Sequence, residues 1–293
     1  MSDFDEGLDD ERDDFDELEP EADTATDLSV PPPVRFHHLK AAGRSGMHAR
    51  LALAGVDSET TTAREKGTGT HALVFETRRV ITYSPPPSPD AKPGAKPKRA
   101  VRSGKAWDAF KAANAGALIL SRTEYEAANR MADAVRADPR AMDVLNATHE
   151  RRILWSSMGR ACRTTPDAAS YLEFATELKT TACADPDRFT WQAIRMGYHA
   201  QMAWHLAGII GAGLGQPEAA YIVAVESAPP WPVTVLKLTE RALDKGTALC
   251  SLWFERLLGF ERSGQWPPYA QHVVDLDVPD DDLELTFGDV EAA

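Results

Sequence analysis

The sequence predicts one mixed α/β or α+β domain in which helices flank a central mixed sheet. The chain has 293 residues, of which 43% are hydrophobic, so it can bury one sizeable core. Along the chain, the apolar spacing changes in the order helices, strand cluster, helix, two strands and helix. This order is typical of a layered domain built around one sheet.

The net charge of −13 is concentrated in the first 28 residues, which hold 14 Asp and Glu against the single Arg12. The remainder is neutral, so the overall acidity does not exclude a DNA partner. A block of like charges repels itself and has little apolar surface to bury. We predict a disordered acidic tail over 1–33, a folded domain over 34–270 and a second acidic tail over 271–293.

No run of 18 or more apolar residues is present, and the chain opens on acidic residues instead of a basic and then apolar segment. These features predict a cytoplasmic protein with no membrane partner. Three cysteines, Cys162, Cys183 and Cys250, are odd in number and widely spaced, which fits neither a disulfide framework nor a CxxC metal site.

Helical patterns dominate the first half of the predicted domain, after the prolines that end at Pro33. A Pro- and Lys-rich stretch over 84–102 predicts an exposed loop, because prolines cannot donate backbone hydrogen bonds. Helices are expected from Ser103 onward, from a capping box at Ser121 and Glu124 to about Ala137, and from Pro139 onward.

Strand patterns begin in the second half. Between residues 150 and 181, short segments separated by Gly, Pro and Asp predict a small antiparallel meander. Its strands are expected at 152–156, 160–164 and 171–180. The remaining expected elements are one long helix over 187–210, strands at 221–225 and 233–238, and a closing helix over 240–259.

The segment Glu177-Leu178-Lys179 places an acid and an amine on one face, because residues two apart in a strand point the same way. We expect this face to be exposed. Asp167 would lie beside Glu177 if the two segments pair as a hairpin. Paired carboxylates beside a lysine suit metal-assisted attack of water on a phosphodiester, because Mg²⁺ binds few carboxylates and retains waters. The alternative for this spacing is an ordinary salt bridge.

A wider set of motifs occurs in an order that one nuclease family shares. The motifs are Gly67-Thr68-Gly69-Thr70-His71, Gly104-Lys105-Ala106-Trp107, Glu150 with Trp155, Asp167, Glu177-Leu178-Lys179-Thr180-Thr181, Tyr198-His199-Ala200-Gln201 and Trp266-Pro267-Pro268-Tyr269. From about His37 to Tyr269 the chain resembles the exodeoxyribonuclease VIII-like branch of the PD-(D/E)xK superfamily, relatives of the phage lambda-type exonucleases. That family commonly has Tyr where this chain has His205.

The resemblance implies a PD-(D/E)xK nuclease-like core with Asp167 and Glu177 as the principal Mg²⁺ ligands. Mn²⁺ is the alternative ion, and the Leu178 carbonyl is a further expected ligand. His71 and Glu150 are implied as outer or second-metal ligands. A structural role for this histidine and a surface ion pair for this glutamate are the alternatives.

Lys179 and Gln201 complete the expected catalytic set with the two acids Asp167 and Glu177. Carboxylates around the lysine amine favour its charged form. We therefore expect Lys179 to orient the attacking water and stabilise negative charge more than to abstract a proton.

Basic residues near the Pro-rich loop, with one aromatic residue, are expected to contact DNA. They are Lys98, Arg99, Arg102, Lys105 and Tyr198. Such cations bind phosphates independently of sequence, although a solvated loop explains them equally well. Tyr198, Gln201 and His205 fall on one helix face, which lines either the core or a DNA cleft.

The function implied by the resemblance is a magnesium-dependent exonuclease that hydrolyses phosphodiester bonds of linear duplex DNA in phage-type recombination or repair. A strand-annealing protein and a homo-oligomer are expected partners besides DNA. A structure-specific or restriction-type endonuclease with the same core, and a catalytically inactive DNA-binding scaffold, are the alternatives. Linear and covalently closed DNA substrates separate the two nuclease hypotheses.

Overall fold

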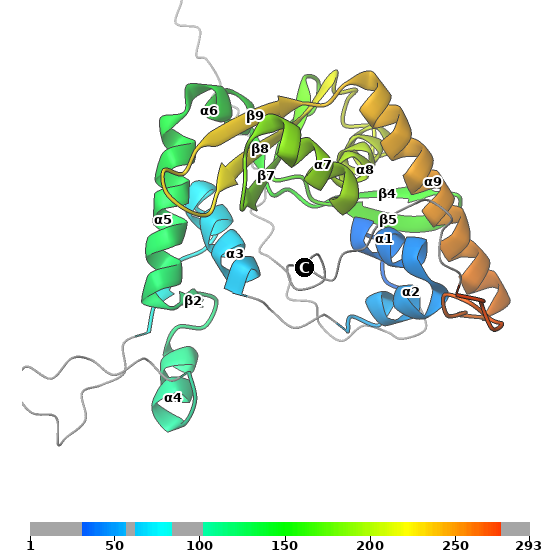
Figure 1. The fold of residues 1–293 in the computed structure, drawn as a ribbon, viewed down its shortest axis with the longest axis horizontal. Coiled ribbons are helices and arrows are strands. Elements are labelled where there is room, and N and C mark those ends of the chain that lie inside the picture. The colour runs from blue at the N-terminus through cyan, green and yellow to red at the C-terminus, as the bar shows by residue number, and fades with distance from the viewer. Residues whose placement is uncertain (1–30, 57–61, 84–101, 277–293) are drawn as a thin grey trace, which may run out of the picture. The chain divides into compact units, whose positions relative to one another are not determined.

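A computed structural model describes residues 31–56, 62–83 and 102–276, and its helices and strands lie in one compact unit that begins at Pro33 (Figure 1). The predicted acidic tail over 1–33 falls almost entirely outside the described residues, as do most of loop 84–102 and residues 277–293. The fold has the predicted class, a central mixed sheet flanked by helices.

The central sheet has five strands in the order β3-β6-β7-β8-β9. Their bounds are β3 (Thr148–His149), β6 (Ala168–Ser170), β7 (Phe174–Thr181), β8 (Ala219–Glu226) and β9 (Val233–Lys237). β7 and β8 pair in parallel, whereas the other neighbouring pairs of this sheet are antiparallel. A parallel pair needs a crossover connection, and two helices supply it, α7 (Pro186–Met196) and α8 (Tyr198–Gly211).

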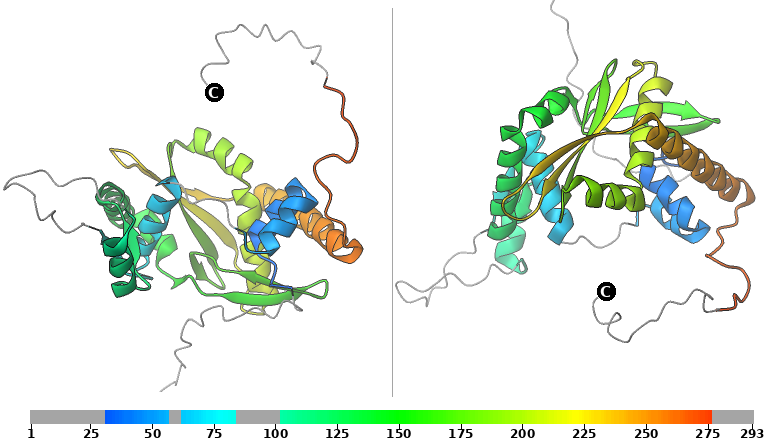
Figure 2. Two further views of the ribbon diagram at one scale, coloured as in Figure 1. Left: turned by 90° about the horizontal axis from the view of Figure 1, so that it is seen from below. Right: turned by 45° about the horizontal axis from the view of Figure 1, so that its top comes forward.

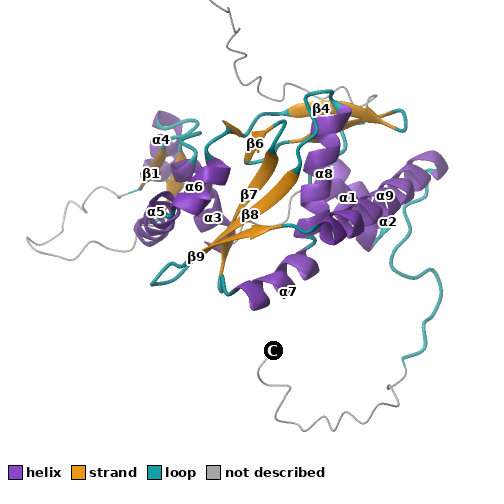
Figure 3. Ribbon diagram, turned by 90° about the horizontal axis from the view of Figure 1, so that it is seen from above, coloured by secondary structure: helices purple, strands orange, loops and turns teal. Residues whose placement is uncertain are grey.

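One face of the sheet is covered by three helices that lie together in Figure 3, namely α3 (Thr62–Val74), α5 (Arg122–Ala137) and α6 (Pro139–Leu145). Leu178 of β7 and Val223 of β8 pack in the same cluster as Met131 and Leu145 of these helices. Because strand side chains alternate, the neighbours of Leu178 along β7 must point to the opposite face.

The opposite face packs against α7 and α8, where Ala175 and Ile222 share a cluster with Phe189, Met202 and Ile209. A further layer packs on α8 (Figure 2) and consists of α1 (Phe36–Arg44), α2 (Gly46–Leu53) and α9 (Glu240–Ser263). α8 therefore lies between the sheet and this outer layer and contributes buried residues to both clusters.

Two short strand pairs lie outside the central sheet. They are the antiparallel hairpin of β4 (Ile153–Ser157) with β5 (Arg160–Thr164), and the parallel pair of β1 (Val80–Thr82) with β2 (Leu118–Leu120). After β1, Tyr83 packs on Trp107 and Phe110 of α4 (Lys105–Ala113). At the start of the domain, Val34 forms a parallel bridge to Cys162 in β5.

Several local predictions are confirmed. Ser121 caps α5 and Glu124 completes the capping box, with the Ser121 N–H donating to Glu124 Oε2 at 2.7 Å. α5 ends at Ala137 and α6 begins at Pro139, as predicted. β8, β9 and α9 occupy their predicted places, although α9 continues to Ser263. The three cysteines are free thiols.

Two predictions are wrong. Residues 187–210 form two helices, because Gly197 takes a left-handed φ of 74° that ends α7 and begins α8. The expected meander is also absent from the described strands, since β5 pairs with β4 whereas β7 pairs with β6 and β8. β6 has only three residues, too few to produce an alternating pattern in the sequence.

In the part of the chain that the structure describes, every helix is too short or too polar to cross a membrane.

The close approach of α8 and α9 depends on Gly246, where an added Cβ would lie 2.4 Å from the His199 carbonyl oxygen. We expect Gly246→Ala to lower the free energy of unfolding by about 1–3 kcal/mol, because backbone blocks the methyl group. Gly259→Ala on the same helix is the matched control. Among the described residues, no atom outside the backbone of its own helix lies within 4 Å of its added Cβ, so this change should stabilise the protein by roughly 0.5–1 kcal/mol. Denaturant unfolding of both variants measures the difference, and equal values would contradict it.

Candidate active site

Three adjacent strands bring three acidic residues into one row. β6 pairs with β3 on one side and β7 on the other through Ala168. The residue before it, Asp167, therefore lies between Glu150 and Glu177, and its carbonyl accepts a hydrogen bond from the Glu150 N–H at 3.1 Å. The hairpin arrangement expected for Asp167 and Glu177 is thus present in the structure.

Glu177 and Lys179 point to the same face of β7. Lys179 Nζ donates to Glu177 Oε2 at 2.6 Å and lies 5.0 Å from the ring centroid of Tyr198. The expectation that this face is exposed is wrong, because α8 packs over it and Glu177 is only 3% exposed. Leu178 points into the opposite helical layer, where it is fully buried.

His71 reaches the row of acids from α3. Its Nε2 lies 2.8 Å from the Leu178 carbonyl oxygen, which can only accept, so Nε2 carries the hydrogen. Burial, and then the charge of Lys179, lowers the pKa of His71, which keeps the ring neutral. Its Nδ1 therefore presents a lone pair, 3.5 Å from Asp167 Oδ2. That lone pair could bind a metal ion.

His205 is the site residue whose role the sequence left open. It lies on α8, and its Nε2 is 2.7 Å from Glu177 Oε1. Its Nδ1 is hydrogen-bonded to the Thr164 hydroxyl at the end of β5. The side chains of Glu177 and His205 are each 4% exposed. Glu177 therefore has one cationic partner, Lys179, and one imidazole partner.

Burial and neighbouring charges set the protonation of the two central acids. Burial, and then the negative charge of Glu177, raises the pKa of Asp167 well above its usual 3.8. Burial alone would also raise the pKa of Glu177, but the charge of Lys179 and the contact with His205 outweigh it and lower that pKa. The pKa of Lys179 is raised because Glu177 and Asp167 outweigh the effect of burial.

The donor set suits a hard divalent cation. Asp167 and Glu177 are largely buried beside each other, and burial, with the negative charge of Glu177, raises the pKa of Asp167. A divalent cation would offset the negative charge of the two carboxylates. Within the described residues, no three His, Cys, Asp or Glu side chains form a ready-made metal cluster. The ion would thus rely on two carboxylates, the Leu178 carbonyl and water, as hard cations with retained waters do.

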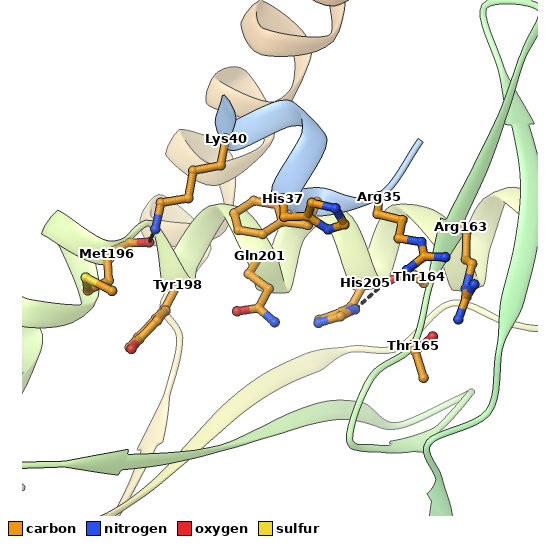
Figure 4. Close-up of a pocket in the computed structure, with 11 residues that line it drawn as sticks. Arg35, His37, Lys40, Arg163, Thr164, Thr165, Met196, Tyr198, Gln201 and His205 are labelled. Atoms are coloured by element: carbon orange, nitrogen blue, oxygen red, sulfur yellow. Dashed lines mark hydrogen bonds between the residues drawn. The ribbon is translucent and has the colours of Figure 1, made fainter. Parts of the chain in front are cut away.

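A cavity of about 380 Å³ opens beside these residues (Figure 4). Tyr198, Gln201 and His205 project into it from one face of α8, so this helix face lines a cleft as well as the core. Three cationic side chains also line it, Arg35 and Lys40 from the start of the domain and Arg163 from β5. Sequence reasoning missed these cations, although Lys40 falls one helical turn from Phe36 in an amphipathic segment.

The residues predicted to bind DNA are dispersed. Arg102 is paired with Glu65 at 3.2 Å and Glu124 at 2.8 Å, so its charge is neutralised within the protein. Lys105 begins α4, and Tyr198 lines the cavity. The other two predicted contacts, Lys98 and Arg99, lie outside the described residues. Glu150, exposed and with a φ of 44°, lies at the border of the acidic row.

Comparison with known proteins gives one family and one fold. Residues 39–275 match the family model described as a PDDEXK-like domain of unknown function (DUF3799). The structure is similar to the crystal structure of a candidate exonuclease from Eubacterium rectale, with a TM-score of 0.59 and 14% sequence identity. The match covers 89% of this chain and 93% of that chain. At this identity the likeness shows the fold alone. No curated protein matches the chain.

The raised pKa of Asp167 predicts a cost of keeping this acid buried without metal. The folded protein binds the Asp167 proton more tightly than the unfolded chain does, so stability falls as pH rises from about 3.8 toward the raised pKa. We expect Asp167→Asn to remove this loss and to raise the Tm of the metal-free protein at pH 7 by about 2–4 °C, or about 1 kcal/mol. Asn keeps an oxygen that can accept from the Leu178 N–H.

Thermal unfolding in chelator at pH 7 and at pH 3 measures this effect. The gain should disappear at the lower pH, where Asp167 is protonated in both states. A Tm that falls at pH 7 would contradict the prediction.

Proposed function

The chain belongs to the family of PDDEXK-like domains of unknown function DUF3799, and we propose that it is a magnesium-dependent exonuclease acting on linear duplex DNA. Membership of this nuclease superfamily supports nuclease activity and implies DNA as the substrate. The observation that carries the proposal is the meeting of Asp167, Glu177 and Lys179 beside a cationic cavity. Acid, acid and lysine are the residue types from which the superfamily takes its name.

Asp167, Glu177 and the Leu178 carbonyl would hold the metal, with His71 Nδ1 and Glu150 at its border. PD-(D/E)xK nucleases typically use divalent metals. When bound, the ion would lower the pKa of a water and neutralise charge on the phosphate. Mg²⁺ suits a site with two carboxylates because it retains several waters. Mn²⁺ accepts the same donors.

Lys179 serves this reaction as a cation. Glu177 and Asp167 raise the pKa of Lys179 despite its burial, which favours the charged amine, so its main role is electrostatic and not that of a general base. Held by Glu177 Oε2 at 2.6 Å, the ammonium orients the attacking water and stabilises negative charge that develops on the phosphate. Gln201 lines the same cavity and offers an amide for hydrogen bonds to substrate or water.

The cationic cavity supports DNA as the substrate of this site. Burial, and then the positive charges of Lys179 and Arg44, lowers the pKa of Lys40. Lys40 is thus repelled by Lys179 and Arg44, and a phosphate bound between them would relieve that repulsion. Arg35 and Arg163 line the same cavity. Cations of this kind bind the DNA backbone without reading its sequence.

We also propose a biological setting for this activity. A role in phage-type recombination or repair, a strand-annealing partner and a homo-oligomeric state rest on the sequence resemblance to the exodeoxyribonuclease VIII-like branch.

Lys179→Ala and Glu177→Gln should each lower the rate of DNA hydrolysis by about 10²-fold or more, because each removes an electrostatic contact at the reacting centre. The assay is Mg²⁺-dependent digestion of linear duplexes labelled separately at each end, with a covalently closed circle alongside. Lys245→Ala, on the exposed side of α9, is the matched control and should retain activity.

Release of label from linear DNA with an intact circle supports an exonuclease. Cleavage of the covalently closed circle would show an endonuclease and contradict the proposed exonuclease activity. Full activity of both site variants would refute the site itself.

Lys40→Gln should weaken duplex binding and reduce the slope of log affinity against log salt by about 0.9, the value expected for one lost phosphate contact. Fluorescence anisotropy in chelator measures binding without cleavage. Lys245→Gln removes an equal charge away from the cavity. An identical salt slope in wild type and Lys40→Gln would place the DNA elsewhere.

A further inference from the structure

Glu177 is held by two partners, and the proposed chemistry uses only one of them. Lys179 occupies Oε2 at 2.6 Å, and His205 Nε2 lies 2.7 Å from Oε1. Both carboxylate oxygens are thus engaged before any substrate arrives. His205 is 3% exposed and comes from α8, a different element from the strand that carries Glu177. This arrangement constrains the carboxylate in rotation as well as in position.

The orientation of His205 is itself determined by a hydrogen bond. Its Nδ1 is bonded to the hydroxyl of Thr164, which is 4% exposed. If the hydroxyl donates to Nδ1, the ring carries its hydrogen on Nε2, the nitrogen that lies 2.7 Å from Glu177 Oε1. The opposite tautomer would place a nitrogen lone pair against the carboxylate, which is repulsive. The carboxylate therefore favours a ring form that carries a hydrogen on Nε2.

The contact of α8 with β5 holds the histidine and the threonine together. Trp204, the residue before His205, donates its Nε1–H to the Arg163 carbonyl at 3.2 Å. One turn later, Gly208 allows close packing, since an added Cβ would lie 2.6 Å from Thr164 Cγ2. Neither element can move independently of the other without breaking these contacts.

We propose that Thr164 and His205 form a positioning pair that orients the Glu177 carboxylate for metal binding. The inference rests on the proposed metal-dependent function and assigns no contact with substrate to either residue. Thr164 also lies three residues before Asp167, at the end of β5. The segment from Thr164 to Asp167 therefore carries Asp167 itself and positions Glu177 through the contact of Thr164 with His205.

If the pair positions Glu177, substitution of either residue should lower the affinity for the metal ion. His205→Leu removes the contact with Glu177, and Thr164→Val removes the hydroxyl at nearly equal size. Each should weaken Mn²⁺ binding to the full chain by about 10- to 100-fold, as loss of an outer hydrogen-bond partner of a metal ligand does. His205→Gln, which keeps an N–H donor, and Thr164→Ser, which keeps the hydroxyl, should restore most of the affinity.

Isothermal titration with Mn²⁺ is the primary measurement, because it does not depend on turnover. Ile209→Val is the matched control, since Ile209 is fully buried on α8 but packs in the apolar cluster facing the sheet. It should lower the Tm while leaving Mn²⁺ affinity unchanged. The Tm of metal-free Thr164→Val and Thr164→Ser, measured in parallel, shows whether each variant is folded.

A second readout separates positioning from a general structural defect. If metal affinity alone is affected, raising the Mn²⁺ concentration should return the DNA hydrolysis rate of Thr164→Val toward that of wild type. If wild type binds Mn²⁺ and the folded Thr164→Val and His205→Leu variants bind it with the same affinity, the positioning role of the pair is overturned. The proposed metal-dependent function would stand. Absence of Mn²⁺ binding in wild type would overturn the proposed metal-dependent function and the pair with it.

Discussion

The site depends on the burial of two carboxylates next to each other, which is unfavourable unless cationic groups compensate their charges. Glu177 receives that compensation from Lys179 and from the contact with His205. Asp167 does not receive enough, and its pKa is raised. Such uncompensated charge is costly in a protein interior. A perturbed acid of this kind at the edge of a cavity is typical of a functional site, in line with the proposed metal-dependent function.

The topology of the sheet places Asp167 and Glu177 next to each other. The antiparallel pairing through β6 places Asp167 opposite Glu177, and the parallel pairing of β7 with β8 requires a helical crossover. That crossover, α7 and α8, returns over the face that carries Glu177 and Lys179. The helix that closes the core thus also lines the cavity, which explains why a single helix face contributes both buried and partly exposed residues.

Sequence patterns predicted what depends on neighbours along the chain. The capping box at Ser121 and the acid-lysine spacing at Glu177 are local signals, and both are present in the structure. The break at Gly197 has only a single glycine as its signal, and because apolar residues continue on both sides the pattern predicts one helix where the structure has two. The pairing of His205 with Thr164 and the approach of Lys40 to the site join segments far apart in the chain, and no local periodicity encodes them.

The glycine contact between α8 and β5 has a consequence for how the site can change. Tyr198, Gln201 and His205 stand on one rigid helix, and Gly208 and Gly211 press that helix against Thr164 and Trp155. A larger residue at either glycine would clash with Thr164 or Trp155, so the helix that carries all three side chains would have to shift. Substitutions at this interface should therefore combine non-additively with those in the cavity. A substitution that alters the packing of α8 on β5 should therefore also alter the cavity that this helix lines.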